Sequence, residues 1–250
     1  MNAMPQRIAA ILIGFLLATG PAMAAEGYTA ADELTDFNAA VEKAAAHNRV
    51  ALGYLRTDNI DLAAIELERL HTAWIELVKL YGEHPPEAFR GNPRYAATLH
   101  DVRFFTTTAL AMLSSGQLSA AREALQRNRQ LSHEMRQASG VVVLADCIID
   151  ANTAMAAFFE FDASPPDWNR PEAVADVAAK ADTLAAVAKR CDALAPAEVR
   201  ESPEFRRLID GIAASLAFVP KAISARDTDM LHRVIGELRA FDQLLIFRYG

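Results

Sequence analysis

Apolar residues recur at helical spacing along almost the whole chain. In the clearest case, residues 60–81, six apolar side chains follow one another at steps of three or four: Ala63, Leu67, Leu70, Trp74, Leu77 and Tyr81. Steps of this size place the side chains on one stripe of an α-helix. No stretch of alternating Val, Ile and Thr bounded by turn signals occurs, as a half-exposed strand would require. The sequence therefore predicts an all-α fold.

A turn that repeats along the chain gives the order of the helices. Residues 55–63 resemble residues 113–121, and residues 223–231 are a looser copy. In each copy an apolar helix end precedes a short polar turn and an Asp, Asn or Ser that can cap the next helix. The fourth turn is expected at residues 162–171, which contain three prolines. The spacing predicts four helical hairpins of about 55 residues, longer than the 34-residue hairpins of tetratricopeptide arrays.

Two hairpins form one antiparallel four-helix bundle, so two consecutive bundles are predicted, residues 25–138 and 139–250. Gly140 marks the joint between them. The sequence leaves open whether residues 118–161 form two helices or one kinked helix, because glycine costs only about 1 kcal/mol inside a helix. The expected helices are 31–56, 60–82, 93–115, 118–138, 140–161, 171–193, 203–224 and 228–248.

The segment 141–161 is mostly apolar but is interrupted by Asp146, Asp150 and Glu160. The two aspartates near its middle would be costly in lipid, so we expect a buried helix rather than a membrane span. A helix that is apolar on most sides has neighbours on most sides. This helix is therefore predicted to be the one against which the other bundle packs.

The N-terminus has the pattern of a secretory signal peptide. Arg7 is followed by an apolar run at residues 8–17 and then by Ala22-Met23-Ala24, small residues of the kind that a signal peptidase reads. A run of about ten residues falls well short of the roughly 20 that span a bilayer. We expect cleavage after Ala24, which leaves a periplasmic mature chain without a transmembrane segment.

Charge and composition narrow the classes of partner. The chain carries a net charge of −7, and removing residues 1–24 takes away Arg7 and no acid, so the mature form carries −8. This charge disfavours nucleic acid and anionic membrane surfaces as partners. Apolar residues make up 52% of the chain, which is enough for substantial cores.

The two cysteines are Cys147 and Cys191. In an exported protein a single cysteine pair is expected to form a disulfide, and antiparallel helices bring both residues to the same end of the second bundle. Their axial offset is roughly 9 Å if the helix ends align, so uneven ends are needed to reach the Cα separation of about 7 Å that a disulfide allows. The alternative is two small buried residues with free thiols. The absence of C-x-x-C argues against structural zinc and covalent haem.

The last helix ends Ala240-Phe241-Asp242-Gln243-Leu244-Leu245-Ile246-Phe247-Arg248. Together with the bundle pattern, this ending resembles the cytochrome c-prime family of periplasmic haem proteins, whose last helix carries C-x-x-C-H followed by Phe-Arg. Phe247 and Arg248 match that ending. Ala240 and Gln243 stand at the cysteine positions, and Leu244 stands at the position of the haem-ligating histidine. The resemblance implies a bundle of this kind without covalent haem.

Histidines of the first bundle are candidates for binding a ligand. His47, His71, His100 and His133 occur once per predicted helix, at positions that fall within about 9 Å along the bundle axis. His71 and Trp74 lie on or beside the apolar stripe, whereas His133 lies on a charged face. The candidate ligand-binding residues are therefore His47, His71, Trp74 and His100, and ordinary half-buried side chains are the alternative.

Other metal-binding patterns are isolated. Residues 68–71 form one E-x-x-H, whereas a di-iron bundle needs two such motifs and two further glutamates. Met230 with His232, and His133 with Met135, are single pairs of the ligands that copper(I) prefers. We therefore assign no metal ligands from the sequence.

Sequence signatures of catalysis are absent, since the chain contains no G-x-S-x-G, no H-E-x-x-H and no glycine-rich loop. Asp146 and Asp150 could form an acid-base couple in an enzyme. A polar seam in which they meet Lys180 or Arg190 of the next helix is the preferred interpretation.

These observations favour a non-catalytic, exported protein without a cofactor that binds a small ligand or another periplasmic protein. The alternative function is a redox or metal carrier that holds non-covalent haem or copper in the core of one bundle.

Overall fold

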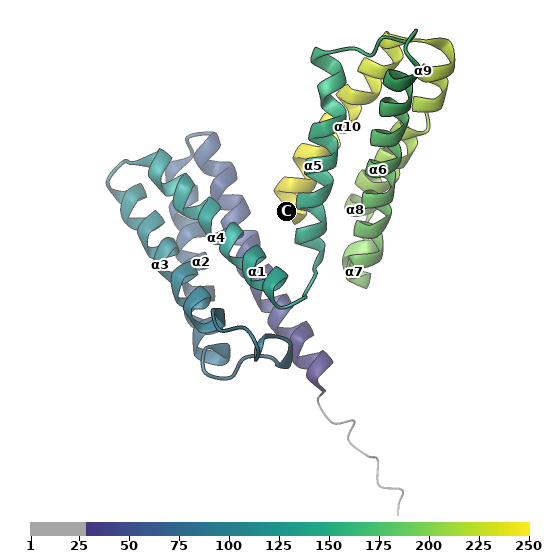
Figure 1. The fold of residues 1–250 in the computed structure, drawn as a ribbon. Coiled ribbons are helices and arrows are strands. Elements are labelled where there is room, and N and C mark those ends of the chain that lie inside the picture. Colours follow the sequence, from purple (N-terminus) through teal and green to yellow (C-terminus); the bar gives the residue numbers. More distant parts are fainter. Residues whose placement is uncertain (1–28) are drawn as a thin grey trace, which may run out of the picture.

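The computed structural model describes residues 29–250, and over this range the chain is helical and has no strand (Figure 1). The all-α prediction is confirmed. The predicted signal peptide, residues 1–24, lies outside the described residues. The long helices are α1 (Ala30–Arg56), α2 (Ile60–Tyr81), α3 (Tyr95–Ser114), α4 (Leu118–Ala138), α5 (Leu144–Ala163), α6 (Pro171–Leu194), α8 (Pro203–Leu216) and α10 (Thr228–Tyr249). Shorter elements are η1 (Glu87–Phe89), α7 (Ala197–Arg200) and α9 (Val219–Ala225).

The repeated turn is one kind of helix ending. A residue with positive φ occupies the same place in each copy: Asp58 (57°), Gly116 (76°) and Arg226 (52°). The next backbone N–H then bonds to a carbonyl five residues back, in the pairs Asn59–Tyr54 (3.0 Å), Gln117–Met112 (2.8 Å) and Asp227–Ala222 (2.9 Å). A left-handed residue followed by this bond is the Schellman motif, which satisfies carbonyls at the helix end and turns the chain.

Side-chain caps fix several helix starts. Thr29 and Asp32 form a capping box at α1, in which the Asp32 backbone N–H donates to Thr29 Oγ1 at 3.2 Å. Asp227 caps α10 by accepting a hydrogen bond from the Met230 backbone N–H at 2.8 Å. Asn59 differs from the expected pattern, because its side chain makes no cap bond to α2.

Helices α1 to α4 surround the first hydrophobic core. Contacts join α1 to α2, α2 to α3, α3 to α4 and α4 to α1, and buried residues such as Leu67 and Leu125 fill the space between them. The link from α2 to α3 covers one end. Its Phe89 packs against Phe37 and Tyr95, with ring centroids 5.1 and 5.4 Å apart.

Helices α5, α6, α8 and α10 surround a second, separate core. Contacts join α5 to α6, α6 to α8, α8 to α10 and α10 to α5, and Met155, Leu184 and Leu238 are among the residues buried between them. The division between the two cores falls after Val141 and before Leu144.

The single helix predicted at residues 203–224 is wrong in detail, because the chain is interrupted after Leu216 and α9 begins at Val219. Pro220 explains the break: it has no backbone N–H, so it is tolerated in the first turn of a helix and disrupts a helix interior. Pro220 lies in the first turn of α9.

Among the described residues, Pro203–Ala225 is a stretch long and apolar enough by composition to cross a membrane, with a mean hydropathy of 1.5. Its residues Phe205, Leu208 and Ile212 lie in the second core. Helices that fill a protein core often share this composition.

The joint between the bundles is a turn rather than a kink. Helix α4 ends at Ala138, Gly140 has a φ of 67°, and the Val141 N–H bonds to the Arg136 carbonyl at 3.0 Å. Residues 118–161 therefore form two helices.

The two bundles touch through α1 and α10 more than through α5. Arg49 Nη1 donates to the Gly250 carbonyl at 3.3 Å, and Gly53 of α1 lies against the ring of Phe247. Figure 1 shows the bundles diverging on either side of this region, with the C-terminus between them. The prediction that the helix at residues 141–161 carries most of this packing is wrong, because α10 lies beside α1.

Candidate functional site

A cavity of about 450 Å³ lies between the two bundles. Its two walls differ in chemistry. The wall from α1 and α4 is polar and includes Asn48, Arg49, Asn128, Arg129, Ser132 and Arg136. The wall from the second bundle and the joint is largely apolar and includes Val142, Leu144, Ile149, Leu194, Val199 and Tyr249. We call this cavity the inter-bundle cleft.

The polar wall arises because polar residues take places in the apolar stripes of α1 and α4. On α4, Asn128 and Ser132 continue the stripe of Ala121 and Leu125 at steps of three and four. On α1, Asn48 lies four residues after the buried Ala44. These positions face inward by helical geometry, so the polar groups are held inside the molecule.

Two asparagine side chains in this wall have unpartnered acceptors. The Asn48 amide donates to the Leu125 carbonyl at 3.2 Å, and the Asn128 amide donates to Thr106 Oγ1 at 3.0 Å. Each residue is at most 4% exposed, and neither Oδ1 atom has a hydrogen-bond partner. A buried unsatisfied acceptor costs about 1–3 kcal/mol, so each oxygen favours an N–H or O–H donor.

Two of the three arginines in the cleft are neutralised by acids. Arg49 is buried and its Nη2 pairs with Glu42 Oε1 at 2.5 Å. Arg136 is also buried and holds Asp146 with two bonds, Nε to Oδ2 at 2.9 Å and Nη2 to Oδ1 at 2.6 Å. This bidentate pair joins the end of α4 to the start of α5, and such geometry is among the strongest that an arginine makes.

Asp146 also contacts two other polar groups at the joint. Its carboxylate accepts bonds from the Val143 backbone N–H at 3.2 Å and lies 2.8 Å from His133 Nδ1. Burial acts to raise the pKa of the Asp146 carboxyl, but Arg136, His133 and the Val143 N–H together bring that pKa below its ordinary value. Asp146 is therefore a structural anion at the joint.

Arg129 differs from the other two arginines because it makes no ion pair or hydrogen bond with the described residues. It is half-buried in the polar wall. Burial, together with the nearby charge of Arg49, lowers the pKa of the Arg129 guanidinium, although an arginine stays protonated in proteins. Arg129 is thus the arginine of the cleft that forms no direct ion pair with the described residues.

The residues predicted to bind a ligand are not brought together. Trp74 is buried and lines the inter-bundle cleft. His47 lies in a separate outer groove between α1 and α2, where its Nδ1 is 2.6 Å from Glu66 Oε2. His71 is half-buried, and His100 is exposed.

Metal ligands are likewise not assembled: no group of three or more His, Cys, Asp or Glu that could hold a metal ion occurs among residues 29–250. Phe247 and Arg248 carry the resemblance to the cytochrome c-prime ending. The ring of Phe247 lies against Gly53, and Arg248 Nε pairs with Glu204 Oε1 at 2.9 Å.

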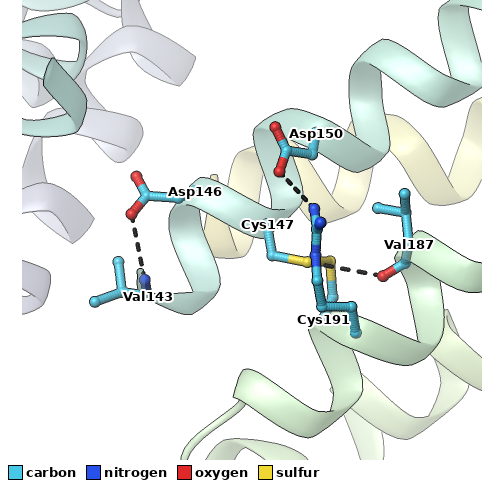
Figure 2. The surroundings of a disulfide bond; sticks show 7 residues. Val143, Asp146, Cys147, Asp150, Val187 and Cys191 are labelled. Carbon is cyan, nitrogen blue, oxygen red and sulfur yellow. Dashed lines mark hydrogen bonds and ion pairs between the residues drawn. A yellow bond between two sulfur atoms is a disulfide. The ribbon is translucent and has the colours of Figure 1, made fainter. Parts of the chain in front are cut away.

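The cysteines meet as predicted. Cys147 and Cys191 form a disulfide with a Cα separation of 5.4 Å, and both residues are fully buried (Figure 2). The bond ties the start of α5 to the end of α6, which is the end of the second bundle that borders the inter-bundle cleft.

Asp146 and Asp150 have separate partners and do not act as a couple (Figure 2). Asp150 pairs with Arg190 at 2.5 Å, as the polar-seam interpretation predicts. Asp146 instead pairs across the joint with Arg136, and Lys180 pairs with Glu160 and Asp176.

No protein-family model matches the chain, and no curated protein or solved structure shows significant similarity to it. The structure itself defines the class: an all-α protein with two helical cores and a ligand-sized cleft between them.

Proposed function

We propose that this protein is exported and binds a small organic molecule in the inter-bundle cleft without converting it chemically. The observation that carries the proposal is the cleft: a concave site within the 300–1,000 Å³ range of ligand pockets, with an apolar wall and a few convergent polar groups. The half-buried Arg129, which has no partner among the described residues, supplies a polar group that a ligand can satisfy.

Two observations support export. Residues 1–24 carry the signal-peptide pattern, and a disulfide persists in an oxidising compartment such as the periplasm. Sequencing the N-terminus of exported protein tests this part: we expect Ala25 or Glu26, and Met1 on the exported protein would contradict it.

Ligand binding is tested by thermal unfolding of the purified protein with a fragment library. The matched variants are Ala145→Phe, which fills the inter-bundle cleft, and Ala97→Phe, which adds the same ring at an exposed site on α3. We expect fragments that raise the melting temperature of the wild type and of Ala97→Phe but not of Ala145→Phe. The absence of such fragments would contradict the proposal, as would a Soret band or stoichiometric copper in periplasmic protein.

A further inference from the structure

One arginine of the inter-bundle cleft forms no ion pair with the described residues, and the terminal carboxyl group of Gly250 also lines the cleft, 3.3 Å from Arg49 Nη1. Arg49 is neutralised by Glu42 and Arg136 by Asp146. Arg129 has no partner among the described residues. Glu198 also lines the cleft, but its side chain is exposed, so water screens it.

The opposite wall supplies a surface for an apolar body. Val142 in the joint is 58% exposed, a large exposure for an aliphatic side chain, and it borders the cleft together with Ile149 and Val199. Covering exposed apolar area stabilises a complex, and this gain is offset in part by the costs of association.

We propose that the inter-bundle cleft binds an organic monocarboxylate, with Arg129 pairing with the carboxylate and the apolar body lying against Val142 and Ile149. A planar guanidinium matches a carboxylate with two parallel hydrogen bonds. This inference rests on the proposed function and names the ligand class for the same site.

The charge count selects a monoanion over a dianion. Arg129 is the one arginine of the cleft without an acid partner, whereas Glu198 and the terminal carboxyl group of Gly250 also border the cleft and would repel further negative charge. A second negative charge on the ligand would therefore remain unpaired in a partly desolvated site, which is unfavourable.

Calorimetric titration of the full protein with four ten-carbon probes tests the inference: decanoate, decan-1-ol, decyl phosphate and decylamine. The variants are Arg129→Gln and a matched control, Arg103→Gln, which removes an exposed arginine on α3 and changes the net charge equally. We expect decanoate to bind the wild type and Arg103→Gln equally, and Arg129→Gln to weaken decanoate by about 10- to 100-fold, the range of a charge-assisted bond. Decan-1-ol should bind less tightly than decanoate and be insensitive to Arg129→Gln.

A second variant separates recognition from folding. Val142→Ser removes part of the apolar wall at an exposed position, so it should weaken decanoate and decan-1-ol alike while leaving the helical circular dichroism unchanged. Equal binding of decanoate and decan-1-ol, or no effect of Arg129→Gln, would overturn the carboxylate inference while leaving the cleft as a binding site. Tighter binding of decyl phosphate or decylamine would overturn it as well, and so would no binding of any probe, whereas the fragment screen decides the proposed function independently.

Discussion

The two bundles have the same helical plan and different interiors. Among the described residues, eight buried polar or charged residues belong to the first bundle and two, Asp146 and Ser215, to the second. The second bundle has an almost wholly apolar core and a buried disulfide instead.

This difference shows how the inter-bundle cleft acquires unlike walls. Five of the eight buried polar residues of the first bundle, all on α1 and α4, line the cleft. On the opposite side the cleft is lined by the apolar residues Val142, Ile149 and Val199. Asp146 is the second bundle's buried acid, and it serves the joint by pairing with Arg136. Buried polar groups are expensive unless they are satisfied, so their concentration at this boundary supports the proposal that a ligand binds there.

The largest expected difference between the bundles comes from the disulfide. Cys147 and Cys191 are 44 residues apart, and in the chain-entropy model such a loop restricts the unfolded state by about 4 kcal/mol. The double variant Cys147→Ala with Cys191→Ala should lower the free energy of unfolding of the second bundle by about 4 kcal/mol. Urea denaturation followed by the fluorescence of Trp168 in the second bundle, and separately of Trp74 in the first, measures the difference. Two reactive thiols in the denatured, unreduced protein would contradict the bond itself.

The joint should depend strongly on Asp146. Asp146→Asn leaves Arg136 buried without its anion, and breaking a buried pair costs about 3 kcal/mol or more. Asp150→Asn on the same helix is the matched control, because the Asp150–Arg190 pair is half exposed, at 54% and 51%, and should contribute less than about 1 kcal/mol. Equal losses of unfolding free energy in the two variants would show that the joint pair has no special role.

Acid provides an independent test of the same pair. The folded-state pKa of Asp146 is lowered, so its contribution to stability is fully present above the ordinary pKa of 3.8 and is lost as pH falls through the lowered value. Asp146→Asn should therefore lose stability less steeply than the wild type below this pH. If the unfolding free energy of Asp146→Asn fell with pH as steeply as that of the wild type, the lowered pKa of Asp146 would be contradicted.

A pair of glycines tests the contact between α1 and α10. Nothing lies within 4 Å of a Cβ added at Gly236 of α10, whereas a Cβ at Gly53 of α1 would lie 2.8 Å from Phe247 Cε2. Replacing glycine by alanine in a helix gains about 1 kcal/mol when the space is free. Gly236→Ala should thus raise the unfolding free energy and Gly53→Ala should not. An equal gain in both variants would show that Phe247 does not pack on Gly53.

The smallest effect concerns Asp242 of α10. Burial raises the pKa of its carboxyl, and the hydrogen bond from Asn152 opposes that change only in part. Its charged form is therefore unfavourable in the folded protein at neutral pH, and stability rises as pH falls through the raised value. Asp242→Asn should stabilise the protein by up to about 0.5 kcal/mol at neutral pH and have no benefit near pH 4. Destabilisation at neutral pH would reverse this interpretation.

Much of the fold follows from the sequence because two local signals agree. The helical spacing of apolar residues predicts the helices, and the repeated turn predicts where they reverse, since each copy forms the same Schellman ending. The helical spacing predicts neither the break at Ala217 nor the short helix α7. The apolar stripe continues through the break, and only the position of Pro220 indicates it.

The inter-bundle cleft was harder to predict, because it depends on how two bundles meet. One signal was present: Asn48, Asn128 and Ser132 occupy stripe positions that are otherwise apolar. The histidine count pointed instead to the interior of the first bundle, where spacing along the axis says nothing about which way each side chain faces. Arg129 lies four residues before His133 on a face that the sequence presents as charged, so its half-buried place in the cleft is not predicted.

The central claim, that a small molecule binds between the bundles, is tested most directly by the two tryptophan indole N–H signals in a proton–nitrogen NMR spectrum. Trp74 lines the inter-bundle cleft, and Trp168 lies in the link between α5 and α6, where its Nε1 donates to Thr228 at 2.9 Å. Titration with a fragment that raises the melting temperature of the wild type should move the Trp74 signal, assigned with Trp74→Phe, in a saturable manner and leave Trp168 in place. A Trp74 signal that does not move, or a shift confined to Trp168, would contradict the account.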